Sequence, residues 1–167
     1  ALERYKARLD QTSAGLDSLE IEDLVTVRDV TSVLQLMEMV RRISADIDSY
    51  VLELGTDGRL LALQVEELTR GLLAEHGFLL EDYLPEGLDT TTVDARLKWV
   101  GSPALLDLAM VARSMGLGGI DGQDLDAQVS PRGLRILSKI PRLPVVTARA
   151  VVEQWGSLQG VLGATIE

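Results

Sequence analysis

The sequence contains no cysteine and only one histidine, His76. Disulfides, Cys-ligated zinc and iron–sulfur clusters are therefore excluded, and a single imidazole cannot build a multi-histidine metal site. Aromatic residues make up only 4% of the 167 residues whereas 46% are hydrophobic, so the core must be aliphatic. A chain this apolar is not disordered. We expect a folded chain with no metal site and no cofactor of its own.

Long hydrophobic runs are also missing. No stretch approaches the roughly 18 consecutive apolar residues that a membrane-spanning helix needs. The first six residues are largely polar and charged, and no apolar signal-peptide segment follows them. These features predict a soluble, cytoplasmic chain with no membrane partner.

Negative charge dominates the chain but is unevenly distributed. The net charge is −10, and residues 1–126 contain 11 Lys and Arg against 24 Asp and Glu, which repels nucleic acid. Between Asp126 and Glu153 the sign reverses, because this stretch has five cations and no acid. The five cations are Arg132, Arg135, Lys139, Arg142 and Arg149. The chain is therefore predicted to be an acidic body followed by a basic terminal module.

Hydrophobic periodicity predicts a long helical hairpin in the first half of the chain. Thr26 and Asp29 have the spacing of a capping box, in which each side chain satisfies a backbone amide at the helix start. Apolar residues then recur every three or four positions, on one helix face. They are Val30, Val33, Met37, Val40, Ile43, Ile47, Val51 and Leu54. Gly55 is expected to end this helix, and a second, antiparallel helix is expected to stop at Gly77.

Shorter helices are predicted on both sides of this hairpin. A polar amphipathic pattern covers residues 3–18. Ser102-Pro103 is typical of an N-cap followed by proline at the first helical position, and this helix should run to Met115. Ser130-Pro131 has the same pattern and is predicted to start another helix. Because no period-two alternation persists, the predicted fold class is all-α: a helical bundle and then a small module.

The glycine-rich, acidic stretch 116–126 is the predicted domain boundary. It separates a helical linker domain at residues 1–120 from a terminal module at residues 127–167. The acids in this stretch do not have the spacing of a calcium-binding loop, so we expect a solvated linker.

The terminal module has the pattern of two short helices joined by the turn Ile140–Pro144. This pattern resembles a truncated helix-hairpin-helix DNA-binding element, which normally pairs with a second hairpin. The resemblance implies that glycines in the turn bring backbone amides to a DNA phosphate. Arg142 and Pro144 stand where those glycines are expected, and Arg142 offers a side-chain charge instead. The predicted phosphate contacts are Arg132, Arg135, Lys139, Arg142 and Arg149.

Several stretches along the chain resemble the DisA family of bacterial DNA integrity scanning proteins. They are Ser18–Val30, Gln35–Val40, Leu52–Leu60, Val129–Gly133 and Ile140–Pro144. The resemblance implies a protein with a diadenylate cyclase domain, a helical linker and a helix-hairpin-helix domain. For the intact protein it implies synthesis of cyclic di-AMP from two ATP with Mg²⁺ or Mn²⁺. It also implies a homo-octamer and inhibition by branched DNA.

The family's cyclase motifs, Asp-Gly-Ala and Arg-His-Arg, are missing from this chain. The nearest tripeptides are Asp57-Gly58-Arg59, Asp121-Gly122-Gln123 and Glu75-His76-Gly77. We therefore expect no catalytic residue and no enzyme activity here. The chain is expected to begin after the cyclase domain, which would be its partner, and to end within the DNA-binding domain.

Two alternatives fit the same residues. In the first, the chain is a helical protein-interaction module whose basic end packs on an acidic partner. In the second, it is the helix-hairpin-helix arm of a DNA-repair nuclease. Steep salt dependence and a preference for junctions over plain duplex would favour the DNA-scanning interpretation.

Overall fold

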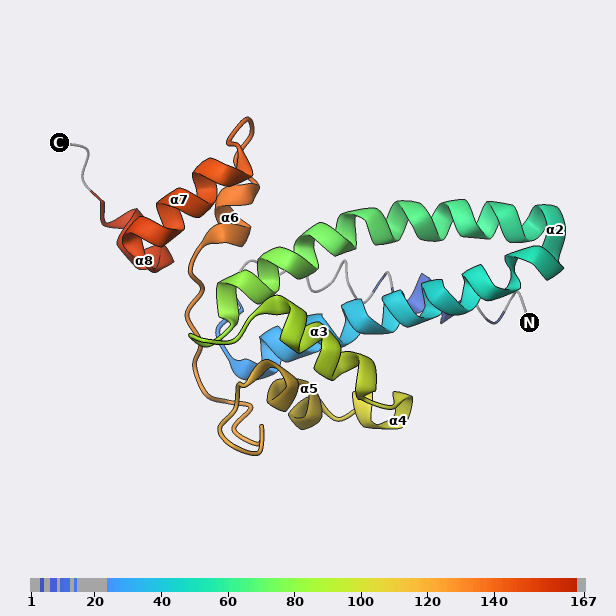
Figure 1. The fold of residues 1–167 in the computed structure, drawn as a ribbon, viewed down its shortest axis with the longest axis horizontal. Coiled ribbons are helices and arrows are strands. Elements are labelled where there is room, and N and C mark those ends of the chain that lie inside the picture. The colour runs from blue at the N-terminus through green and yellow to red at the C-terminus, as the bar shows by residue number, and fades with distance from the viewer. Residues whose placement is uncertain (1–3, 5–6, 9, 13, 15–23, 165–167) are drawn as a thin grey trace.

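The computed structural model describes residues 4, 7–8, 10–12, 14 and 24–164. These residues form helices and no strand, so the predicted all-α fold class is confirmed. The helices, numbered as in Figure 1, are α2 (Val27–Tyr83), α3 (Thr90–Trp99), α4 (Ser102–Leu105), α5 (Leu108–Met115), α6 (Leu134–Ser138), α7 (Val145–Trp155) and α8 (Leu158–Leu162). The helix predicted over 3–18 lies largely outside the described residues. Among the described helices, none combines the length and the apolarity of a membrane-spanning segment.

Helix α2 is a hairpin that runs along the long axis of the molecule (Figure 1). Its two halves lie side by side and antiparallel, because Gly55 breaks the helix with φ 60° and ψ −130°. The predicted turn at Gly55 is therefore confirmed. The predicted capping box is also present: the Asp29 amide donates to the Thr26 hydroxyl, and the Thr26 amide donates to the Asp29 carboxylate.

The predicted apolar face of the first half of α2 is buried, and Val30, Val33 and Met37 belong to the main core. Every member of that face with a described side chain is buried. They are Val30, Val33, Met37, Val40, Ile43 and Ile47. The side chains of Val51 and Leu54 lie outside the described residues.

The predicted end of the second helix at Gly77 is wrong, because α2 continues to Tyr83. A glycine inside a helix costs about 1 kcal/mol relative to alanine. The turn after Gly77 buries Leu79 and Leu80 completely, and burying one leucine side chain stabilises by about 1.5–3 kcal/mol. Core packing therefore outweighs the local preference of the glycine.

The segment from Ser102 to Met115 was predicted as one helix, but it forms two. Gly101, rather than Ser102, is the N-cap of α4, and α5 begins after Asp107. The Asp107 carboxylate accepts a hydrogen bond from the Ala109 amide at 3.0 Å. Aspartate prefers such a cap to a helix interior, which explains the break. Helix α5 ends as predicted, at Gly116 with φ 71°.

The acidic stretch after Gly116 returns to the start of α2. The Val27 amide donates to the Ala127 carbonyl at 2.9 Å, and the Arg28 amide donates to the Leu125 carbonyl at 2.8 Å. These bonds satisfy amides in the first turn of α2 that have no partner within the helix. The predicted linker is therefore held to α2, and it leads the chain to the open end of the hairpin.

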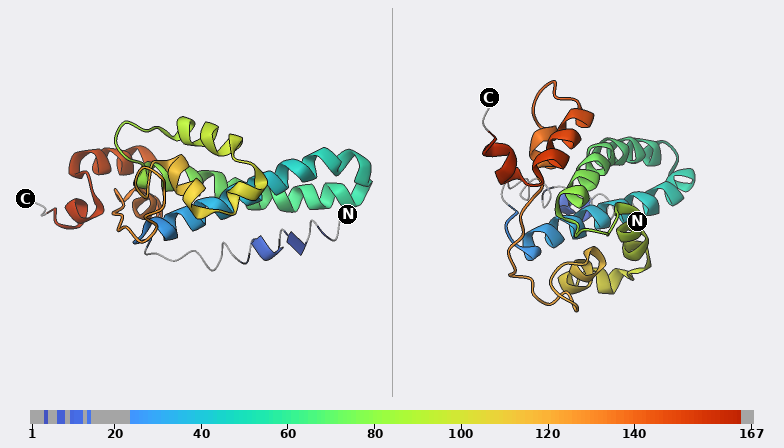
Figure 2. Two further views of the ribbon diagram at one scale, coloured as in Figure 1. Left: turned by 90° about the horizontal axis from the view of Figure 1, so that it is seen from below. Right: turned by 60° about the vertical axis from the view of Figure 1, so that its left-hand side comes forward.

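Helices α6, α7 and α8 form the terminal module at that end of α2 (Figure 2). Their small core contains Leu134, Leu137, Ala148 and Val152, with Phe78 of α2 packed against it. The predicted helix start at Ser130-Pro131 is wrong, since α6 begins at Leu134.

Candidate nucleic-acid interface

The turn between α6 and α7 carries two exposed cations, Lys139 and Arg142. Arg142 has φ 68° and is the one non-glycine residue with positive φ in the described part of the chain. This left-handed conformation favours glycine. Arg142 therefore occupies a backbone conformation that suits glycine, while its side chain supplies a charge.

The start of α7 lies next to these two cations. Pro144 is the N-cap residue, and no described side chain caps the helix there. The first amides of this 11-residue helix are therefore available to solvent, and they carry the positive end of the helix dipole. Cations and amides at one turn are a suitable environment for a phosphate.

Arg132 and Arg135 face the body of the molecule instead of solvent. Arg132 donates from Nη1 to the Glu81 carbonyl at 2.7 Å and from Nη2 to the Leu84 carbonyl at 2.8 Å. It thereby satisfies carbonyls at the end of α2. Arg135 is buried, and its Nε lies 3.3 Å from Oε2 of Glu75. Both arginines thus hold the terminal module against α2 through direct hydrogen bonds.

Arg149 connects α7 to the same end of α2. Its Nε and Nη2 donate to the two carboxylate oxygens of Glu81, at 2.9 and 2.8 Å. Hydrogen bonding to Glu81 raises the pKa of Arg149. The pair stays partly exposed to solvent, so another anion can reach the guanidinium.

Asp82 is the centre of this attachment, and the sequence patterns did not identify it. Its carboxylate is buried and accepts hydrogen bonds from the amides of Gly133, Leu134 and Arg135 at 3.1, 2.7 and 3.0 Å. Burial raises the pKa of Asp82, and the three amides and the Arg135 charge oppose that rise. The carboxylate caps α6 from a different helix, so no local signal at Ser130-Pro131 could reveal it.

The structure thus divides the five predicted phosphate ligands into two groups. Lys139 and Arg142 lie together on the exposed turn, whereas Arg132, Arg135 and Arg149 bind groups of α2. DNA contact by these residues stays a prediction.

The single histidine lies inside α2 rather than at a helix end. His76 Nε2 is 3.5 Å from Oδ1 of Asp94 on α3. Burial lowers the pKa of His76, against the opposing charges of Asp94 and Glu38. Within the described residues, no group of three or more His, Asp and Glu side chains is arranged to hold a metal ion.

The fold defines an all-helical linker with a small helical module held at one end. The family model of the DisA bacterial checkpoint controller linker region matches residues 1–123, and the chain belongs to this family. It is 50% identical to the DNA integrity scanning protein DisA of Streptomyces coelicolor over 99% of this chain and 46% of that protein. The DisA protein of Parafrankia sp. is 51% identical over 99% of this chain and 47% of its own length. The chain therefore spans about half the length of the curated relatives it matches.

Proposed function

We propose that this chain is the non-catalytic linker and DNA-binding portion of a DNA integrity scanning diadenylate cyclase. The terminal module would contact the backbone of branched DNA, and α2 would connect it to the cyclase domain. That domain would make cyclic di-AMP from two ATP with Mg²⁺ or Mn²⁺ in a homo-octamer, and junction DNA would inhibit it. Membership in the linker family and the similarity to DisA proteins over 99% of the chain support this proposal.

The observation that carries the proposal is the attachment of the terminal module to α2. Asp82 and Arg132 bind backbone groups across this joint, and buried Arg135 adds an ion pair with the partly exposed Glu75. A module held by so many directed bonds cannot turn without moving the end of α2. Such a joint would let a displacement of the terminal module on DNA reach α2.

Lys139 and Arg142 are the proposed primary phosphate contacts. They are exposed, and neither forms an ion pair with another residue in the described ranges. Arg149 would join them when a phosphate displaces Glu81. Arg132 and Arg135 are proposed to position the module rather than to bind DNA directly.

Fluorescence anisotropy with a labelled four-way junction and a matched duplex tests this proposal. We expect tighter binding to the junction and a steep loss of affinity as salt rises. The double variant Lys139→Glu/Arg142→Glu should bind the junction at least roughly tenfold more weakly. Arg59→Glu, which changes an exposed arginine just after the Gly55 turn of α2, is the control. Equal losses in the double variant and the control would contradict the assignment.

A protein-interaction module is the second candidate, because apolar side chains flank the same turn. Ile140 and Val146 are 46% and 78% exposed. Exposed apolar groups beside cations suit a protein partner with an acidic rim. Absence of DNA binding at low salt would favour this function. The nuclease-arm hypothesis is set aside, because the family match covers α2.

A further inference from the structure

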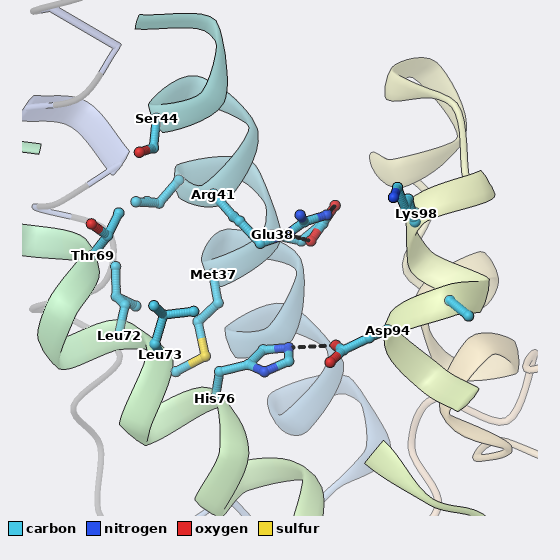
Figure 3. A pocket seen from close by; sticks show the side chains of 12 residues that line it. Met37, Glu38, Arg41, Ser44, Thr69, Leu72, Leu73, His76, Asp94 and Lys98 are labelled. Carbon is cyan, nitrogen blue, oxygen red and sulfur yellow. Dashed lines mark hydrogen bonds and ion pairs between the residues drawn. The ribbon is translucent and has the colours of Figure 1, made fainter. Parts of the chain in front are cut away.

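A second site lies between the two halves of α2 and helix α3. A cavity of about 390 Å³ opens there (Figure 3). Its apolar part is formed by Met37, Val40, Leu72 and Leu73. Figure 3 shows the Met37, Leu72 and Leu73 side chains gathered between the halves of α2, with charged side chains on the side facing α3.

The buried acid in this cavity, Glu38, is already saturated. Arg41 donates to both of its carboxylate oxygens at 2.7 Å, and Arg42 Nε adds a third bond at 2.7 Å. Burial alone would raise the pKa of Glu38, but the hydrogen bonds from Arg41 and Arg42 outweigh it and lower the pKa. Glu38 therefore stays ionised, with its oxygens directed at the two guanidinium groups.

The charges that line the cavity balance, although the chain as a whole is acidic. Two cations, Arg41 and Lys98, line it together with two carboxylates, those of Glu38 and Asp94. Burial lowers the pKa of the nearby histidine, so its ring adds no charge at neutral pH.

Both of these cations have N–H donors that are not used by Glu38 or Asp94. Lys98 is exposed, and its ammonium has no ion-pair partner among the described residues. Arg41 uses Nε and Nη2 for Glu38, which leaves Nη1 free of any hydrogen bond within the described part of the chain, and its side chain is 50% exposed. A free ammonium and a free guanidinium N–H beside an apolar surface are suited to a carboxylate or phosphate attached to an apolar body.

We propose that this cavity binds a small amphipathic organic anion. Its apolar body would lie against Met37, Leu72 and Leu73, and its carboxylate or phosphate would bind Lys98 and Nη1 of Arg41. The volume is within the range of small-molecule sites, roughly 300–1,000 Å³. Such a ligand would contact both halves of α2 as well as α3. The inference does not depend on DNA binding by the terminal module.

Methyl NMR of the full chain labelled at its methionines tests this site, with decanoate below its micelle-forming concentration as the probe. The methyl group of Met37 should shift, whereas those of Met39, Met110 and Met115 serve as internal controls because they do not line the cavity. Lys98→Glu should weaken decanoate binding by roughly tenfold or more. Arg59→Glu makes the same charge change at an exposed residue just after the Gly55 turn, does not alter the cavity lining and should leave binding unchanged.

Decanol has the same apolar body without the charge, so it separates the apolar contribution to binding from the contribution of the carboxylate. Weaker binding of decanol, together with the loss in Lys98→Glu, would support the proposal. Equal binding of decanol and decanoate, unaffected by Lys98→Glu, would overturn the assignment to an anion. An unshifted Met37 methyl, or equal shifts of all four methyls, would overturn the site itself.

Discussion

Arg149 of α7 and Glu81 of α2 form a bidentate ion pair between these two helices, with N–O distances of 2.9 and 2.8 Å. The two residues are 68 positions apart, so the pair exists only in the folded chain. A DNA phosphate that binds Arg149 must compete with this carboxylate. Glu81 is therefore expected to limit the affinity of the module for DNA.

Removing this competitor should strengthen DNA binding. Glu81→Gln frees the guanidinium and deletes one negative charge near the phosphate, so junction affinity should rise roughly two- to fivefold at low salt. Anisotropy measurements check this. Glu66→Gln breaks the comparable exposed pair with Arg70 on α2 and is the matched control. The same affinity change in both variants would exclude a specific role of Glu81.

Loss of the Asp82 cap should loosen the terminal module. Asp82→Ala leaves three amides at the start of α6 without their acceptor in a buried place, which should cost about 2–3 kcal/mol in the free energy of unfolding. Urea denaturation measures that loss, and hydrogen exchange should show faster exchange of the α6 amides. Asp89→Ala removes an exposed cap of α3 as a comparison. It should destabilise the chain less and leave α6 exchange unchanged.

Acid should destabilise the chain through His76. Because burial lowers its pKa in the folded state, the unfolded chain takes up a proton at a higher pH than the folded chain does. The contribution of the neutral ring is complete above the ordinary histidine pKa of about 6.5 and declines as pH falls toward the folded-state value. Urea midpoints at about pH 7.5 and about pH 5.5 should therefore differ less in His76→Gln than in the natural sequence. If the difference between the two urea midpoints were as large in His76→Gln as in the natural sequence, the pH dependence would come from carboxylates instead.

Two glycines of α2 should respond oppositely to alanine. Gly77 lies inside the helix and a Cβ there meets no atom within 4 Å, so Gly77→Ala should stabilise by about 0.5–1 kcal/mol. A Cβ at Gly55 also meets open space, but φ is +60°, so Gly55→Ala should destabilise by about 1 kcal/mol or more. Thermal unfolding distinguishes the two signs. Stabilisation by both substitutions would contradict the left-handed turn.

Local sequence patterns were sufficient to predict a structural feature where the residues that stabilise it lie within one or two helical turns of each other. The Thr26–Asp29 capping box, the apolar face of the first half of α2 and the turn at Gly55 were all predictable. Their physical causes are short-range: a side chain satisfies a nearby amide, periodicity aligns apolar groups, and glycine tolerates positive φ. The linker-family resemblance also depended on contiguous stretches, and the family match bears it out.

The sequence by itself thus determined an all-helical chain with a long hairpin, an acidic body and a basic end. Only the tertiary structure decided where α6 starts and which cations remain free. Asp82 caps α6 from 51–53 residues away. Arg132 and Arg135 bind groups at the end of α2 that are 48–60 residues away. The local sequence around a charged helix residue is the same whether its side chain faces solvent or a buried partner. Whether the residue is free to bind a ligand is therefore decided by how its helix packs against the helix that carries the partner.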